Sequence, residues 1–416
     1  MQIRDYYSPR RSEAIVCEPF APYLESFAQS LEDSGYSKLT ILCKIGTADH
    51  LAHWLQHKQI APAEMGDDIC QCFLRHLPAC RCSMLNHGKS IHHARWAVPQ
   101  FLEHLRGIGI VAASDIKETN QDHCPEIAAF RHWMLQHRGV TGLSLKVYNR
   151  VLPALLDTVN NDIDRLNART LRDFVLQRAK HLSRGSTNNE VHAVRMFLRY
   201  LIAEGKSPPS LDAAIPTMAN WQLSALPRYL SSPDVERVIK SCDCSTKTGV
   251  RDLAIILLLA RLGLRASDVA ALRLSDVDWR EASIRVSGKG RRAVCLPLTQ
   301  EVGDAILKYL ECGRPNVASD RLFIRARAPL RPFADASAVS AIASAAIRRS
   351  GVSTPFRGSH VLRHSAATGM LRQGVSLQDI SIILRHRHLD TTALYAKVDV
   401  ALLRTIAQPW PEVMPC

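Results

Sequence analysis

Six residues in the C-terminal half of the chain have the types needed to cleave a phosphodiester without a metal ion. Such cleavage needs cations that neutralise the phosphate, a nucleophile, and an acid that protonates the leaving oxygen. The guanidinium of arginine can bind a phosphate through two N–H groups at once. The tyrosine hydroxyl can attack the phosphorus, and lysine and histidine can transfer protons. The six residues are Arg265, Lys289, His360, Arg363, His386 and Tyr395.

Each of the first two positions falls on a recognisable element. In "ARLGLRASDVAALRL", Arg265 follows a glycine break and begins a new helical stretch. Residues 283–298 read "SIRVSGKGRRAVCLPL", with β-branched residues on both sides of a GKG turn. This pattern predicts a β-hairpin. Lys289 would stand at its tip, where an ammonium group can reach out of the protein.

The other four positions lie close to the C-terminus. "SHVLRHS" puts His360, Arg363 and His364 at positions i, i+3 and i+4, which share one face of a helix. His386 and Tyr395 follow in "ILRHRHLDTTALYAKV". A lone tyrosine in such a segment is normally a packing residue. The order and spacing of the whole set, rather than any one member, indicate a reactive site.

In this order the segments resemble the motifs of tyrosine recombinases, which include phage-type integrases and Xer-type resolvases. "GLRASDVAALRL" resembles the family's first arginine box, and "SHVLRHSAATGML" its histidine–arginine box. "ILRHRHLDTTALYAKV" resembles the segment that carries the nucleophile. The resemblance is close over residues 226–400 and looser before them. It implies a mainly α-helical (α+β) fold, with a small β-sheet in the C-terminal domain.

The resemblance also implies a role for each residue. Arg265 and Arg363 would clamp the scissile phosphate, and Lys289 would protonate the leaving 5′ oxygen. No metal, nucleotide or other cofactor is implied. The reaction would exchange one phosphodiester for another, so the bond energy would be kept and no ATP consumed.

By the same resemblance, Tyr395 would attack and form a 3′-phosphotyrosine. A free tyrosine has a pKa of about 10, so its phenol needs help near neutral pH. His360 would assist proton transfer at the tyrosine, and His386 would hydrogen-bond the phosphate. We expect His364 and His388 to be structural rather than catalytic.

One position departs from the family pattern. In the family, the residue before the histidine that corresponds to His386 is usually glycine, which suits a left-handed turn. Here that residue is Arg385. We expect Arg385 to add a phosphate contact. Asp268 occupies the acidic position of the first box, and we expect it to support Arg265 rather than to react.

The length of 416 residues predicts more than one domain. By the family resemblance, we expect residues 1–115 to be a helical arm or an additional core-binding-like unit. We expect residues 120–215 to be a helical core-binding domain with SAM-like character. These two blocks show weak internal similarity. A proline-rich linker over 205–233 leads into a catalytic domain at 226–416, with a C-terminal tail that could dock a neighbouring subunit.

Charge and composition favour a nucleic-acid partner. The formal net charge is +14 and the isoelectric point is about 9.4, which suits a polyanion. The family resemblance implies a homotetramer on double-stranded DNA sites, with or without partner recombinases. We find neither a signal peptide nor a membrane segment, so we expect a cytoplasmic, nucleoid-associated protein with reduced thiols.

Two further groups of residues could bind ligands. Arg184, Arg195 and Arg199 belong to a basic stretch at the start of a predicted helix, and we weigh a DNA-facing edge equally against a solvated surface. C-x-C pairs with nearby histidines could hold zinc, although their spacing favours buried free thiols. The second group comprises Cys70, Cys72, Cys80, Cys82, His87, His92 and His93.

Three other functions remain open. A type IB topoisomerase would use a similar site, but the extra N-terminal block favours recombination at specific sites. A metal-dependent transposase or nuclease would use clustered carboxylates. A DNA-binding regulator without activity would not need all six residues. The carboxylates available for the second alternative are Asp252, Asp268, Asp276 and Asp278.

Overall fold

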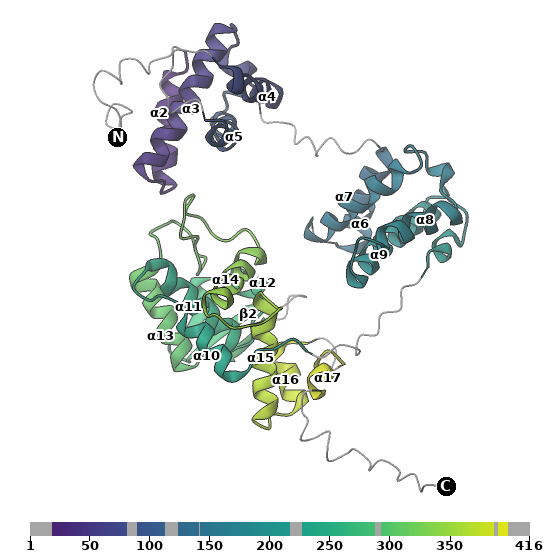
Figure 1. Cartoon of the computed structure of the whole chain (residues 1–416), viewed down its shortest axis with the longest axis vertical. Helices are drawn as coiled ribbons and strands as arrows, with labels where there is room; N and C mark the ends of the chain where they lie inside the picture. Colours follow the sequence, from purple (N-terminus) through teal and green to yellow (C-terminus); the bar gives the residue numbers. More distant parts are fainter. Residues whose placement is uncertain are drawn as a thin grey trace. The chain divides into compact units, whose positions relative to one another are not determined.

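The computed structural model describes residues 19–80, 90–112, 124–140, 142–216, 227–287, 293–386 and 390–397 (Figure 1). Helices dominate these residues, and their strands form one antiparallel sheet in the order β1-β2-β3. The predicted fold class, mainly α-helical with a small sheet near the C-terminus, is therefore confirmed. No helix in the described ranges is long and apolar enough to cross a membrane.

The chain divides into two compact units, Ala112–Ser224 and a second unit made of Met1–Val111 and Ala225–Cys416. The second unit contains separate hydrophobic cores at its N-terminal and C-terminal ends. We call residues 19–112 the first helical body, residues 124–216 the second helical body, and the described residues from 227 onward the C-terminal block.

In the first helical body, polar caps mark where helices begin. Ser37 accepts a hydrogen bond from the backbone N–H of Thr40, and Ser90 accepts one from that of His93. Phe27, Leu51 and Phe101 are fully or almost fully buried in its core. The helices are α2 (Ala21–Asp33), α3 (Lys38–His57), α4 (Asp67–His76) and α5 (Ile91–Gly107), with 3₁₀ turns η3 (Pro62–Glu64) and η4 (Leu77–Ala79).

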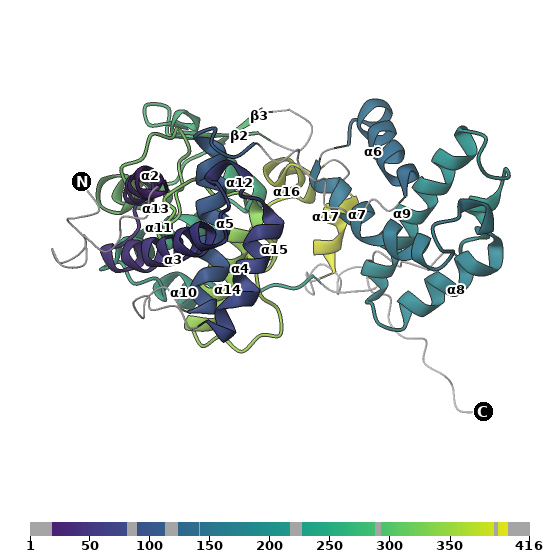
Figure 2. The same cartoon turned by 90° about the horizontal axis from the view of Figure 1, so that it is seen from above.

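The second helical body is built in a similar way (Figures 1 and 2). Asn167 accepts hydrogen bonds from the backbone N–H groups of Arg169 and Thr170, and so begins its third helix. Gly139 closes its first helix with a φ of 56°. The helices are α6 (Pro125–Arg138), α7 (Gly142–Asp157), α8 (Ala168–Ala179) and α9 (Arg184–Ala203), with 3₁₀ turns η6 (Ile163–Arg165) and η7 (Leu211–Ala214).

A serine cap marks the first helix of the C-terminal block. Ser231 accepts a hydrogen bond from the backbone N–H of Asp234 and caps the first helix. A largely apolar helix, α11, fills the centre of the core. The helices are α10 (Ser232–Lys240), α11 (Lys247–Ala260), α12 (Ala266–Ala271), α13 (Gln300–Lys308), α14 (Ala336–Arg349), α15 (Ser359–Arg372), α16 (Leu377–Leu384) and α17 (Asp390–Ala396), with a 3₁₀ turn η8 (Leu274–Asp276) and a π-helical turn η9 (Tyr309–Gly313).

The sheet contains the hairpin predicted for residues 283–298. Strand β1 (Val277–Asp278) pairs with β2 (Ser283–Ser287), and β2 pairs with β3 (Ala293–Pro297). The register sets Ser283 opposite Pro297 and Ser287 opposite Ala293. The turn at 288–292, which includes Lys289, lies outside the described residues.

Candidate active site

Arg363 is held by main-chain oxygens from two other segments. Arg363 is 5% exposed, and its guanidinium donates to the carbonyls of Gly263 and Leu384, both at 2.5 Å. Gly263 has a φ of 61°, and a Cβ there would lie 2.7 Å from the Leu384 side chain. The glycine of the first arginine box, Gly263, therefore allows the close approach that anchors Arg363.

Arg265 lies beside Arg363 at the start of α12. Its guanidinium donates to the carbonyl of Arg385 at 2.9 Å. Burial and the neighbouring Arg265 lower the pKa of Arg363 to about 10, so Arg363 still carries its charge at neutral pH. The structure thus brings together the two arginines that the sequence predicts as a phosphate clamp.

Arg385 keeps the left-handed backbone expected at this position, with φ 55° and ψ 50°. Its side chain turns inward and pairs with Asp268, the Nη2–Oδ2 distance being 2.5 Å. Asp268 also accepts a hydrogen bond from the backbone N–H of Arg265. The buried Arg385 Nε and Nη1 have no hydrogen-bond partner among the described residues. Arg385 therefore links the segment that carries His386 and Tyr395 to the first arginine box.

We expect Arg385→Gly to destabilise the C-terminal block by about 2 kcal/mol. The change relieves about 1 kcal/mol of left-handed strain. It also leaves the buried Asp268 carboxylate without its partner, which costs about 3 kcal/mol. Denaturant unfolding of the full chain measures the difference.

The matched control is Ala282→Gly, since Ala282 is exposed and has a φ of 44°. That change relieves strain alone, so it should be neutral or stabilising. Combining Arg385→Gly with Asp268→Asn should restore much of the lost stability. An Arg385→Gly variant at least as stable as the original chain would contradict the importance of the pair.

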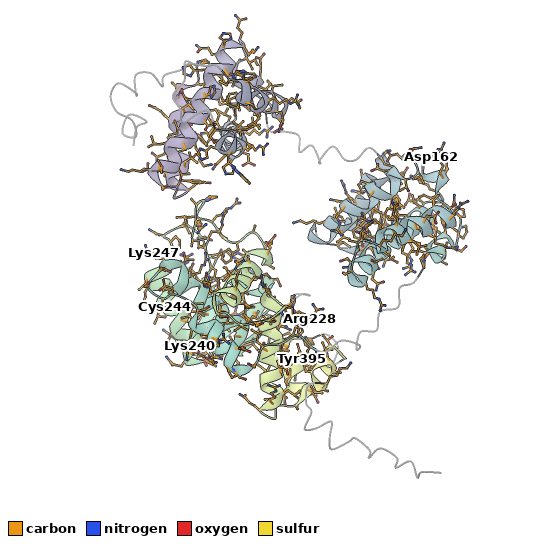
Figure 3. The ribbon with its side chains drawn as sticks, in the orientation of Figure 1. Asp162, Arg228, Lys240, Cys244, Lys247 and Tyr395 are labelled. Carbon is orange, nitrogen blue, oxygen red and sulfur yellow. The ribbon has the colours of Figure 1, made fainter. Side chains whose placement is uncertain are left out.

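Tyr395 is both a packing residue and a directed hydroxyl. It lies on α17 (Figure 3). It is 1% exposed and belongs to a small core that includes Leu371, Ile380 and Leu384. Its hydroxyl lies 2.9 Å from Nδ1 of His364. Burial raises the tyrosine pKa, and Arg363 and Arg265 oppose that rise. The phenol is therefore protonated at neutral pH and needs a base.

His364 is the imidazole that contacts the tyrosine hydroxyl, although the sequence favours a structural role for it. Burial, His360 and Arg363 lower its pKa to about 4, so the ring is neutral and can accept a proton. His360 is exposed one turn earlier on α15, with its ring 6.5 Å from that of His364. Its pKa is also lowered, by partial burial and by both arginines.

His386 also lies beside the ring of Tyr395. Its ring is nearly parallel to that of Tyr395, with centroids 6.4 Å apart. Its Nδ1 lies 2.7 Å from the hydroxyl of Thr392, a fully buried residue on α17. Burial and Arg363 lower the pKa of His386 to about 4. A neutral ring whose Nδ1 accepts from Thr392 has an Nε2–H left to donate.

The arginines suggested as a DNA-facing edge fall into two groups. Arg195 donates to the carbonyl of Ile215, and Arg199 pairs with Asp212, so both connect α9 to η7. Arg184 is exposed at the first residue of α9. Of the three, Arg184 is the one whose side chain stands at an exposed helix start, where a phosphate is favoured.

The four carboxylates considered for metal chemistry have other partners. Asp252 pairs with Arg251 at 2.7 Å, and Asp268 pairs with Arg385. Asp276 accepts from the backbone N–H of Arg273, and Asp278 accepts from two backbone N–H groups that follow it. Each of these carboxylates therefore has a structural role in the C-terminal block.

Comparison with known sequences agrees with this geometry. Residues 228–401 match the profile of the phage integrase family. A Sinorhizobium fredii protein named as an integrase/recombinase, y4rA, is 36% identical over 402 residues, covering 94% of this chain and 95% of that protein. Tyrosine recombinase XerD of Listeria monocytogenes is 28% identical over 293 residues, covering 67% of this chain and 96% of XerD.

Solved structures share the fold. A XerH recombinase bound to palindromic difH substrate aligns with a TM-score of 0.55 and 19% identity, covering 70% of this chain and 89% of that one. A lambda integrase tetramer bound to a Holliday junction aligns with a TM-score of 0.52 and 16% identity, covering 80% and 91%. The chain therefore belongs to the phage integrase family of tyrosine recombinases, enzymes that cleave and rejoin DNA strands in site-specific recombination.

Proposed function

We propose that Tyr395 is the nucleophile of this recombinase and that Arg265 and Arg363 hold the scissile phosphate. The observation that carries the proposal is the convergence of a buried tyrosine hydroxyl, a neutral imidazole and two guanidiniums from three separate segments. The arginines would stabilise the charge that develops on the phosphorus oxygens. Main-chain carbonyls fix their orientation before DNA arrives.

The proton movements follow from the protonation states. Tyr395 Oη attacks the phosphorus while His364 accepts its proton, and the bond from phosphorus to the 5′ oxygen breaks. Lys289, predicted at the hairpin tip, donates the proton that the leaving oxygen needs. His386 donates through Nε2 to a phosphate oxygen, and His360 assists from the exposed side of His364.

We expect the cleavage rate to be insensitive to histidine protonation from about pH 6 to about pH 8. With a pKa of about 4, His364 is neutral throughout this range, and the rate falls only as the pH approaches that value. His364→Ala should slow cleavage by roughly 10²-fold, as loss of a general base does. Single-turnover rates on a suicide substrate measure both effects.

His360→Ala is the comparison that separates the two histidines. It should slow cleavage less than His364→Ala, because His360 does not contact the tyrosine hydroxyl in this arrangement. A larger loss for His360→Ala would instead make His360 the base. A rate that rises tenfold per pH unit across neutrality would contradict a neutral His364.

We further propose three domains, at 1–115, 120–215 and 226–416, which close around double-stranded DNA. The solved structure of XerH bound to difH substrate supports DNA as the partner, and that of a lambda integrase tetramer bound to a Holliday junction supports a homotetrameric assembly on two sites. A basic, DNA-acting enzyme would work in the cytoplasm and associate with the nucleoid. The tail that would dock a neighbour, with Leu402, Leu403 and Ile406, lies outside the described residues.

Recombination in the presence of EDTA tests the function. Plasmids that carry the DNA flanking the gene for this protein should yield recombinant products without metal or ATP. A type IB topoisomerase would relax supercoiled plasmids of any sequence and form no recombinants. A metal-dependent nuclease or transposase would be inactive in EDTA. Either of these two results would overturn the proposal.

A further inference from the structure

A second group of chemically reactive side chains lies in the first helical body, outside the recombination site. It joins His50 on α3, His76 at the end of α4, and Cys80 just after η4. One ligand atom from each residue lies within 4.8 Å of the other two. The Nε2 atom of His50 lies 3.4 Å from the Sγ atom of Cys80.

His50 is the most deeply buried member of the group. It is 0% exposed within a hydrophobic core, and the ring of Phe73 lies 5.2 Å away, edge-on. An imidazole is costly to bury unless its nitrogens are bonded. The Nε2 atom of His50 forms a hydrogen bond with the Cys80 thiol. This hydrogen bond does not explain why a second imidazole, that of His76, converges on the same point from another helix.

Metal coordination accounts for all three side chains together. Zinc binds histidine nitrogen at about 2.0 Å and cysteine sulfur at about 2.3 Å, so a tetrahedral ion sets these atoms about 3.5 Å apart. The observed 3.4 Å matches that separation. The ligand atom of His76 lies within 4.8 Å of the other two, so it would have to move by at most on the order of 1 Å to reach the tetrahedral separation. Two imidazoles and a thiolate favour zinc over the oxygen-seeking calcium and magnesium.

We propose that His50, His76 and Cys80 form a Zn²⁺ site that ties α3 to the α4–η4 segment of the first helical body. A fourth position is left for a water molecule. Because ligands that are distant in sequence meet at the ion, binding would stabilise this small body. The site is independent of the recombination chemistry, which uses residues of the C-terminal block.

The site differs from the cysteine–histidine cluster that the sequence suggests. Of that cluster, only Cys80 among the described residues belongs to the group. Cys70 is buried, and burial with nearby Asp67 raises its pKa to about 12, which makes it a core thiol. Cys72, His92 and His93 are exposed. Cys82 and His87 lie outside the described residues.

Metal binding by the full chain, prepared without a histidine tag, tests the proposal. We expect about one equivalent of zinc per chain after dialysis. Replacement with Co²⁺ should give the ligand-field absorption of a tetrahedral ion and a thiolate charge-transfer band. Adding zinc to metal-free protein should also raise the midpoint of its thermal unfolding.

Cys80→Ser is the decisive variant, and Cys72→Ser is its matched control, with an exposed thiol on the neighbouring helix. Cys80→Ser should lose the charge-transfer band and the zinc-dependent stabilisation, and Cys72→Ser should keep both. His76→Gln should weaken binding at least about tenfold without disturbing the buried His50. Substoichiometric zinc, or equal binding by the two serine variants, would overturn the proposal.

Discussion

Replacing Tyr395 by phenylalanine should lower the rate of DNA strand cleavage by at least about 10⁴-fold, the scale of loss when a nucleophile is removed. The ring would still pack against Leu371, Ile380 and Leu384. Only the hydroxyl and its contact with His364 are lost, so stability should change by about 1 kcal/mol. DNA binding without covalent attachment should persist. Gel separation of covalent adducts, beside a binding assay, measures both.

Tyr309→Phe is the matched control for this change. Tyr309 is also fully buried in the C-terminal block, and its hydroxyl accepts a hydrogen bond from the backbone N–H of Ile324. Its replacement should cost similar stability and leave the cleavage rate close to that of the original chain. Residual cleavage of similar size in Tyr395→Phe would mean that another group attacks the phosphorus.

The second large effect is expected at Arg363. Arg363→Lys should slow cleavage by about 10²- to 10³-fold, as loss of a donor to a developing oxyanion does. Lysine keeps the charge, but it lacks the planar fork that can hold two main-chain carbonyls and still face a phosphate. Single-turnover cleavage and thermal unfolding should be measured on the same preparation.

Arg372→Lys provides the comparison on the same helix. Arg372 is exposed, and it donates to the hydroxyl of Tyr229. Its replacement should leave cleavage within about threefold of the original rate, because surface contacts contribute little. If folded Arg363→Lys also stayed within that range, Arg363 would not be part of the phosphate clamp.

Local signals in the sequence predict the elements well. The glycine break before Arg265 and the β-branched residues around the GKG turn each depend on residues close together in the chain. The helix face shared by His360 and Arg363 follows from the helical repeat alone. These rules predict the helix that carries His360 and Arg363 and the hairpin of β2 and β3, and the family resemblance adds the fold class.

Contacts between distant segments are what the sequence does not predict. The ion pair between Asp268 and Arg385 forms only because α16 ends against the start of α12. His364 meets Tyr395 through the packing of α15 against α17. In the sequence, His364 simply follows Arg363 on the same helix, and nothing in that position predicts its contact with Tyr395. Similarly, His50 reads as an ordinary helical residue until the fold brings Cys80 to it.

The most direct test of the central claim is to identify the residue that becomes joined to DNA. Adducts trapped on a suicide substrate would be digested with nuclease and protease, and the modified peptide located by mass spectrometry. We predict that the modified peptide contains Tyr395 and carries a nucleotide joined through its 3′ phosphate. Fragmentation should place this phosphate on the phenol oxygen. A nucleotide on any other residue, or cut DNA with no protein attached, would contradict the account.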